Sequence, residues 1–262
     1  MKTSKPNKSK PETELRVVAL FTDFGGSGPY IGQLEVVIYQ SASNAKIINL
    51  VSDAPVANPK SSAYLLAALA KTFMQPTVFL AVVDPGVGGE RLPVVLQADG
   101  HYFVGPDNGL LNTVTVQSQQ CQWQQIIWQP EHCSSSFHGR DIFAPIVADL
   151  INNNGTEKLV AIDTPESVSD WSADLPEVIY IDHYGNAMTG LRFNEAMLGN
   201  FLSVNGHKIA QAQTFFQVPI GIAFWYQNSC GLVEIAVNRG RAQQQLRLEI
   251  GMPISFSEQH IR

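Results

Sequence analysis

An apolar run that ends abruptly in an acid and closely spaced glycines is the feature that most constrains this chain. Residues 77–81 (TVFLA) have the composition of a buried strand, and residues 82–91 (VVDPGVGGER) follow directly. In open α/β sheets, ligands bind beyond the carboxyl ends of the strands, so Asp84 is a candidate for chemistry. Arg91 can fold back over the same loop. A tight turn in which Asp84 caps the next element is an equally good local interpretation.

A second apolar run also ends next to an acidic residue and glycines. Residues 15–21 (LRVVALF) are β-prone and lead into residues 22–26 (TDFGG), which places Asp23 on a loop. Helical and extended patterns then alternate over residues 30–42, 45–51 and 58–73. This alternation predicts a mostly parallel sheet with helices on both faces, and therefore an α/β fold.

The middle of the chain continues this pattern less regularly. Asp99-Gly100 is a hairpin signal between two extended runs, whereas the glutamine-rich residues 117–125 match neither a helix nor a core strand. Residues 142–151 have the apolar spacing of a buried helix. His138 is therefore expected just before a helix N-terminus, where backbone N–H groups can receive an anion.

Beyond the proline-bounded residues 164–176, short strands and turns replace the long helices. We therefore predict an N-terminal α/β domain over residues 15–170 and a smaller C-terminal β-barrel domain over residues 176–262. Strands are expected over residues 178–182, 187–192, 201–204, 208–210, 220–226, 232–237, 246–250 and 253–256. Residues 1–14, rich in Lys, Ser and Pro, are expected to form a disordered tail.

Composition excludes several classes of function. The formal net charge of the 262 residues is −6, and the basic residues are dispersed outside the tail, which argues against a nucleic-acid or membrane partner. The 3 cysteines form no CxxC pair, which favours reduced thiols in a cytoplasmic protein. No HExxH motif or dense histidine cluster supports a metal site, although a metal hydrolase stays an alternative.

Polar side chains at the predicted loops form two groups of candidates. The first domain offers Asp23, Asp84, Asp107, His138 and Asp141, of which Asp107 and Asp141 look most like caps. The second domain offers the turn at residues 182–186 (DHYGN), which brings an acid and an amide together, and residues 228–231 (NSCG) before a strand. Ordinary turns explain each signal equally well when it is taken alone.

Taken together, the motifs resemble one family. The chain is similar to the S-adenosyl-L-methionine hydroxide adenosyltransferases, relatives of the bacterial fluorinase and chlorinase, over residues 15–251. The resemblance rests on FTDFG (21–25), VDPGVG (83–88) with Arg91, GPDNG (105–109), FHGRD (137–141), DHYGN (182–186), and NS (228–229) with GLVEIAVN (231–238).

The resemblance implies a homotrimer with active sites between subunits. The reaction implied is hydrolysis of S-adenosyl-L-methionine by water or hydroxide attack at the ribose C5′, which yields adenosine and L-methionine without a cofactor or metal. By position, the residues that handle the water are Asp84, Arg91 and His138. The substrate-binding residues are Asp23 at the ribose diol, Asn186 at adenine, and Asp182 and Ser229 at the methionine end.

The chemistry fits these assignments. Methionine leaves a sulfonium as a neutral thioether, so catalysis requires activation and alignment of the water rather than an acid. Arg91 stays protonated and can stabilise a developing hydroxide, while either Asp84 or His138 can accept the proton. Two positions depart from the family pattern: Gly28 stands where many members have an acid, and Cys230 stands where the halogenases have a basic residue. A halogenase of the same superfamily and a non-catalytic binding protein are the alternatives.

Overall fold

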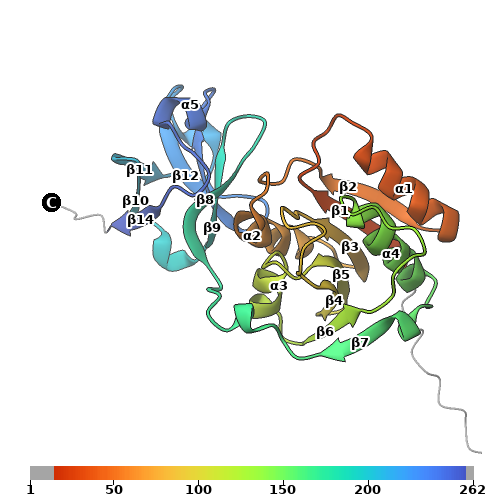
Figure 1. Ribbon diagram of the computed structural model, residues 1–262. Helices are drawn as coiled ribbons and strands as arrows, with labels where there is room; N and C mark the ends of the chain where they lie inside the picture. Colours follow the sequence, from red (N-terminus) through yellow and green to blue (C-terminus); the bar gives the residue numbers. More distant parts are fainter. Residues whose placement is uncertain (1–14, 258–262) are drawn as a thin grey trace, which may run out of the picture.

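The computed structural model describes residues 15–257. The predicted tail at residues 1–14 and the last residues of the predicted second domain, 258–262, lie outside the described residues. Two 7-stranded sheets organise the described part of the chain, one built from β1–β7 and the other from β8–β14. Figure 1 shows them side by side, with the helices gathered mainly around the first sheet. The α/β class with a second, sheet-rich domain is confirmed.

The first sheet has a parallel part that runs through β2, β1, β3 and β5, and an antiparallel part formed by β4, β6 and β7. Its strands are β1 (Val17–Thr22), β2 (Lys46–Val51), β3 (Thr77–Val82), β4 (Pro93–Ala98), β5 (His101–Pro106), β6 (Cys121–Ile126) and β7 (Leu159–Ile162). The hairpin predicted around Asp99-Gly100 joins β4 and β5. Most of β6, which lies between β4 and β7, falls within the glutamine-rich stretch that the sequence left unassigned.

Helices cover both faces of this sheet. Alternate residues of a strand point to opposite faces, and in β1 Ala19 and Phe21 pack into one hydrophobic core while Val18 and Leu20 pack into another. Helices α2 (Pro59–Ala70) and α3 (Asn112–Gln117) close the first core, and α1 (Tyr30–Ser41) and α4 (Ala144–Ile151) close the second. This layered arrangement leaves the loops at the strand ends free for a site.

The second sheet comes close to closing into a barrel. Its strand order is β14-β10-β11-β12-β13-β9-β8, and an isolated bridge from Glu177 to Pro253 connects the two edges. The strands are β8 (Leu175–Ile181), β9 (Ala187–Arg192), β10 (Phe201–Val204), β11 (His207–Gln211), β12 (Ala223–Gln227), β13 (Leu232–Val237) and β14 (Ile254–Ser257). Only β11 and β12 pair in parallel among these neighbours.

The predicted strand over residues 246–250 is wrong. A short helix, α5 (Ala242–Leu246), ends there, and Arg247 then adopts a left-handed conformation with φ 53°. Ala242 and Leu246 are four residues apart and therefore lie on one helix face, which is buried in the core of the second sheet. Short 3₁₀ turns occupy Thr156–Lys158, Glu166–Val168, Glu195–Met197 and Phe215–Gln217.

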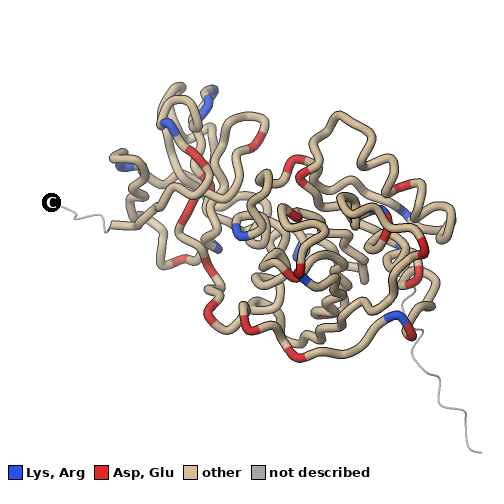
Figure 2. The backbone as a smooth tube through the Cα atoms, in the orientation of Figure 1, with Lys and Arg blue, Asp and Glu red and all other residues tan. Residues whose placement is uncertain are grey.

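The two sheets are joined through α2. Leu175 and Ile179 of β8 pack into the same core as α2, and the hydroxyl of Tyr64 donates to the backbone oxygen of Ser172 at 2.7 Å. In Figure 2, the positions of acidic and basic residues are scattered along the backbone of both halves and form no continuous stretch of one sign among the described residues. None of the helices within residues 15–257 has the length and apolar character needed to cross a membrane.

Candidate active site

The register of β1 and β3 brings two predicted acids to one edge of the first sheet. The strands are parallel neighbours, and Thr22 lies opposite Val82. Asp23 follows β1 directly, and Asp84 follows β3 after the buried Val83. All six residues of β3 are buried, so packing on both faces holds the strand in place. Asp84 lies just beyond its end.

Gly88 fixes the path of the loop that follows Asp84. Its φ is +80°, and a Cβ atom at this position would lie only 2.5 Å from the backbone oxygen of Ser135. A glycine is therefore required both for the backbone conformation and for the close approach. This contact places the loop of Asp84 against the segment that carries His138.

Asp84, Arg91 and His138 form one connected cluster. The Nε of Arg91 donates to both carboxylate oxygens of Asp84, at 3.2 and 3.0 Å, and its Nη2 contacts Asp84 Oδ2 and lies 3.0 Å from His138 Nδ1. The side chains of Arg91 and Asp84 are only 9% and 3% exposed. The guanidinium also stacks on Phe143, 5.4 Å from the ring centre. A buried, paired guanidinium of this kind is a fixed positive charge beside the two other groups.

The contact with Arg91 determines the protonation of His138. A guanidinium has only donors, so Nδ1 must accept and the proton of the neutral ring must sit on Nε2. Burial lowers the pKa of His138, and the charge of Arg91 lowers it further, although Asp84 and Asp141 oppose this shift. His138 is therefore a neutral ring that offers an Nε2–H donor.

A cavity of about 120 Å³ brings Asp84 and His138 of this cluster together with Asp23. Its lining includes Asp23, Asp84 and His138 together with Phe24 and Phe137. Asp23 Oδ2 accepts from the backbone N–H of Ala57 at 2.9 Å, which orients the carboxylate. The cavity therefore combines a carboxylate pair with an imidazole donor at the end of the first sheet.

Sequence reasoning missed the aromatic wall beside this cavity. Phe24, Tyr30 and Phe137 form a mutual cluster with ring centres 5.4–5.8 Å apart. Phe24 follows Asp23 and Phe137 precedes His138, so the signal was present as aromatic neighbours of two candidate residues. These rings offer an apolar surface next to the polar groups.

The two acids predicted as caps stay outside the cavity lining. Asp141 accepts from the backbone N–H of Ser134 at 2.8 Å and pairs with Arg140, whose hydrogen bond holds the pKa of Asp141 below its usual range. It thereby ties the segment before His138 to the π-helical turn Gly139–Phe143. Burial raises the pKa of Asp107.

The predicted residues of the second domain line another cavity, of about 730 Å³. Asp182, Asn186 and Ser229 all contribute to it. Asp182 accepts from the backbone N–H of Asn186 at 2.8 Å and from its side-chain amide at 3.1 Å, so the tight turn holds both groups in fixed orientation. The lining of this cavity shares no described residue with that of the first.

A buried carboxylate, Glu234, organises the loop of Ser229 and was missed by the sequence reasoning. Glu234 is 3% exposed, and it accepts from the hydroxyl of Tyr226 and from the side-chain amide of Asn228 at 2.9 Å. Asn228 in turn accepts from the backbone N–H groups of Cys230 and Leu232 at 3.0 Å. Burial raises the pKa of Glu234. The only sequence signal was an acid within an otherwise apolar strand.

Comparison with known families settles the resemblance. The SAM hydroxide adenosyltransferase N-terminal domain matches residues 18–160, and the SAM hydroxide adenosyltransferase C-terminal domain matches residues 176–255. The chain belongs to the SAM hydroxide adenosyltransferase family. The predicted domain limits of 15–170 and 176–262 stay predictions, as do the roles of the individual residues.

Proteins from several organisms match this chain over most of its length. The (R)-S-adenosyl-L-methionine hydrolase of Thermus thermophilus is 34% identical, over 92% of this chain and 99% of the relative. The enzyme of the same name from Salinispora arenicola is 31% identical, over 89% and 95%. A crystal structure of an uncharacterized conserved protein from Thermotoga maritima has a TM-score of 0.82 at 30% identity, and covers 92% of this chain and 100% of that one.

The structure gives a physical reason for glycine at position 28. Gly28, which precedes Pro29-Tyr30 in this adenosyltransferase family member, has a φ of +120°. An L-amino acid rarely adopts that conformation, so an acid could not replace Gly28 without a change in the backbone. Residues 15–257 contain no cluster of three or more His, Cys, Asp or Glu that could hold a metal ion.

Proposed function

We propose that this protein hydrolyses S-adenosyl-L-methionine to adenosine and L-methionine. The observation that carries the proposal is the Asp84–Arg91–His138 cluster, which shares a cavity edge with Asp23. Relatives at 34% and 31% identity carry the name (R)-S-adenosyl-L-methionine hydrolase. On the basis of this similarity, we propose that the present chain acts on the same substrate, with the R configuration at sulfur.

The cluster suggests separate roles for His138 and Asp84 toward the attacking water. The Nε2–H of His138 can donate to the water oxygen, and Asp84 retains acceptor sites beyond those used by Arg91, because a carboxylate has about four. We assign Asp84 as the proton acceptor, since Nδ1 of His138 is already engaged by Arg91. The water oxygen forms a bond to C5′, the C5′–S bond breaks with its electrons remaining on sulfur, and the water proton passes to Asp84.

The remaining groups would hold the substrate. Asp23 is assigned to the ribose diol, because a carboxylate oriented by the Ala57 N–H can accept from both hydroxyls. Asn186 is assigned to adenine, and Asp182 and Ser229 to the methionine end. The sulfonium leaves as a neutral thioether, so the proposed reaction needs neither cofactor nor metal.

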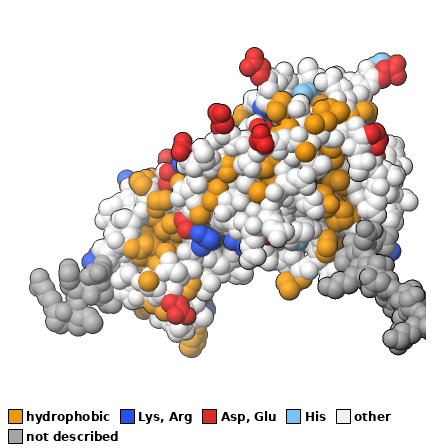
Figure 3. Space-filling model, turned by 90° about the horizontal axis from the view of Figure 1, so that it is seen from below, with side chains coloured by type: hydrophobic (Ala, Val, Ile, Leu, Met, Phe, Trp, Pro, Cys, Tyr) orange, Lys and Arg blue, Asp and Glu red, His pale blue; other side chains and the backbone are white. Residues whose placement is uncertain are grey.

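A homotrimer with active sites between subunits is the assembly we propose. The two sets of assigned residues line separate cavities on one chain, and a site that uses both would form where the second domain of one subunit covers the first domain of another. Large apolar side chains remain exposed, including Val56 at 78%, Tyr184 at 72% and Phe216 at 99%. Figure 3 shows hydrophobic side chains grouped over both halves of the face in view. Such patches are typical of subunit interfaces.

The proposed partners are limited to the substrate and further copies of the chain, with no role for nucleic acid or membrane. A formal charge of −6 and the scattered positive charges support this restriction. A cytoplasmic location is proposed from the three cysteines, which are all free.

The deciding experiment is turnover of S-adenosyl-L-methionine in oxygen-18 water, followed by mass analysis of adenosine and methionine. We expect one label in the adenosine 5′-hydroxyl and none in methionine. Adenosine without label would exclude attack of water at C5′, and a halide-dependent 5′-halo product would identify a halogenase instead. Binding without any turnover would support the non-catalytic alternative.

Subunit mixing tests the assembly. Asp84→Asn carries a defect in the first cavity and Asp182→Ala in the second, so each homotrimer should lose most of its activity. Subunits exchanged between the two variants should regain activity, because some mixed interfaces combine two unaltered halves. No recovery despite proven exchange, or a monomeric protein in sedimentation velocity, would refute sites shared between subunits.

A further inference from the structure

The GPDNG motif at residues 105–109 has no role in the proposed reaction, yet it lies beside the loop that carries Asp84 and Arg91. The motif begins in the last two residues of β5, and β5 lies between β3 and β4 in the first sheet. The loop connects these same two strands, because it leaves the end of β3 and enters β4. It therefore crosses over the end of β5, and the motif lies between the two ends of the loop.

The first end of the loop is held by a side chain of the motif. The pairing of β3 with β5 ends before Val83, the residue that precedes Asp84, and Pro106 has no N–H with which to extend it. The side-chain amide of Asn108 instead donates to the backbone oxygen of Val83 at 2.9 Å. Its Oδ1 accepts from the backbone N–H of Leu110 at 3.2 Å, so the amide group is fixed by hydrogen bonds on both sides.

The second end of the loop is held by the backbone of the motif. The N–H of Asp107 donates to the backbone oxygen of Leu92, which directly follows Arg91, at 2.9 Å. Gly105 allows β5 to lie close against β3, because a Cβ atom there would be only 2.2 Å from the backbone oxygen of Ala81. Adjacent residues of one motif therefore hold both ends of the loop.

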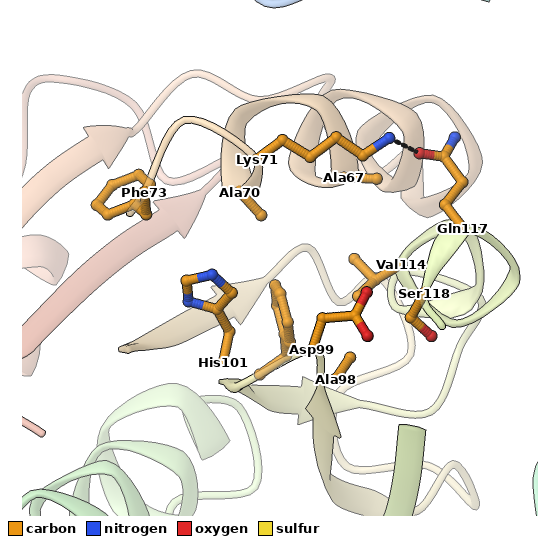
Figure 4. Close-up of a pocket in the computed structure, with 11 residues that line it drawn as sticks. Ala67, Ala70, Lys71, Phe73, Ala98, Asp99, His101, Val114, Gln117 and Ser118 are labelled. Atoms are coloured by element: carbon orange, nitrogen blue, oxygen red, sulfur yellow. Dashed lines mark hydrogen bonds between the residues drawn. The ribbon is translucent and has the colours of Figure 1, made fainter. Parts of the chain in front are cut away.

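The β4–β5 hairpin that carries the motif is itself anchored at its turn. The carboxylate of Asp99 accepts from the backbone N–H groups of Gln119 and Gln120 at 3.0–3.1 Å, just after α3. This turn borders a third cavity, of about 230 Å³, and Figure 4 shows Asp99 and His101 in its lining. Both strands of the hairpin are also paired on their outer sides, β5 with β3 and β4 with β6. The motif therefore extends from a firmly held part of the sheet.

We infer that Asn108 is a positioning residue for the proposed hydrolysis, which holds Asp84 and Arg91 in the orientation that the attacking water requires. It acts through its hydrogen bond to the backbone of Val83. Asn108 is absent from the described linings of all three cavities, so its effect reaches the substrate only through the loop. The effect on the rate rests on the proposed function, whereas the position of the loop can be measured without turnover.

Kinetics of three variants test this role. Asn108→Ala removes both hydrogen bonds of the amide, whereas Asn108→Asp keeps the acceptor for Leu110 and removes the donor to Val83. Both should lower kcat for adenosine release by about 10–10²-fold with little change in KM, because misplaced catalytic groups slow the chemical step. Asn112→Ala is the matched control, since the buried Asn112 amide donates to the backbone oxygen of Ser167, at 3.1 Å, away from the loop. It should leave kcat unchanged.

NMR titration of His138 separates this role from the proposed function. Arg91 lowers the pKa of His138, so a loosened loop in Asn108→Ala should raise that pKa toward 6.5, whereas Asn112→Ala should leave it unchanged. This measurement needs no substrate. A natural chain that releases no adenosine would refute the proposed hydrolysis, and the titration would still decide whether Asn108 holds the loop.

Circular dichroism would establish that each variant is folded, and Asn108→Asp serves alone in the kinetic test if Asn108→Ala is not. An unchanged kcat in the folded Asn108 variants would overturn the inference. A loss in Asn108→Ala that Asn108→Asp does not share would assign the effect to the Leu110 contact and overturn it too. Equal effects of Asn108→Ala and Asn112→Ala on kcat or on the His138 titration would show a general loss of stability instead of positioning.

Discussion

The Nη2 atom of Arg91 lies 3.0 Å from Nδ1 of His138, and the same guanidinium is paired with Asp84. Because a guanidinium can only donate, this contact fixes the neutral tautomer of the imidazole and leaves Nε2–H as the only ring donor. The sequence left Asp84 and His138 as equal candidates for the proton acceptor. The geometry favours Asp84 as the proposed acceptor. Four predictions test the roles of Asp84, Arg91 and His138 and the loop that Gly88 holds in place.

Replacement of Asp84 by Asn should reduce kcat with little change in KM. The amide keeps the shape of the side chain but removes the proposed proton acceptor, and loss of a general base typically costs about 10²–10⁴-fold. Initial rates of adenosine release at several substrate concentrations would separate kcat from KM. Equal activity of Asp84→Asn and the natural chain would contradict the assignment.

Replacement of Arg91 by Lys should lower kcat by about 10²-fold, because an ammonium cannot bridge a carboxylate and an imidazole in the planar geometry of a guanidinium. Arg192→Lys is the matched control. Arg192 makes a similar two-point contact with Asp174, at 2.8 and 2.7 Å, but lies on the surface outside all three cavities. Comparable losses in both variants would indicate a general effect of the substitution rather than a role in catalysis.

The His138 ring should titrate below the ordinary value of 6.5, because burial and Arg91 both disfavour its charged form. Below pH 6.5 the unfolded chain then binds more protons than the folded one at this position, so its contribution to stability is present at neutral pH and declines as the pH falls from 6.5 toward the folded pKa. NMR of carbon-13-labelled histidine, with His138→Gln for assignment, measures this directly. A titration at or above 6.5 would contradict the proposed electrostatics.

Gly88→Ala should lower the free energy of unfolding and reduce activity, since the new Cβ would collide with Ser135 in addition to the strain of a positive φ. Gly206→Ala provides the control, because Gly206 has a similar φ of +75° but open space around its Cβ position. Urea unfolding should show a loss of about 1 kcal/mol in the control and a larger loss at Gly88. Equal losses would show that the contact with Ser135 contributes nothing.

Much of the first sheet could be predicted from the chain because its signals are local. Apolar runs that end at Asp23 and Asp84, and helical spacing in α1, α2 and α4, reflect burial on one or both faces of each element. The motifs also carried enough information to identify the family. Glu234 illustrates the limit: an acid in a buried strand has no local explanation until Tyr226 and Asn228 are placed around it.

Position along the chain therefore determined which residues are delivered to loops, and the order of those loops indicated the family. Only the tertiary structure decided that Arg91 contacts His138 across 47 positions, that Asp182 and Ser229 line a separate cavity, and that residues 242–246 form a helix rather than lead into a strand. Local patterning reports whether a residue is buried, but not which distant residue it meets. That choice depends on how whole layers pack, and on glycines such as Gly88 that allow two segments to touch.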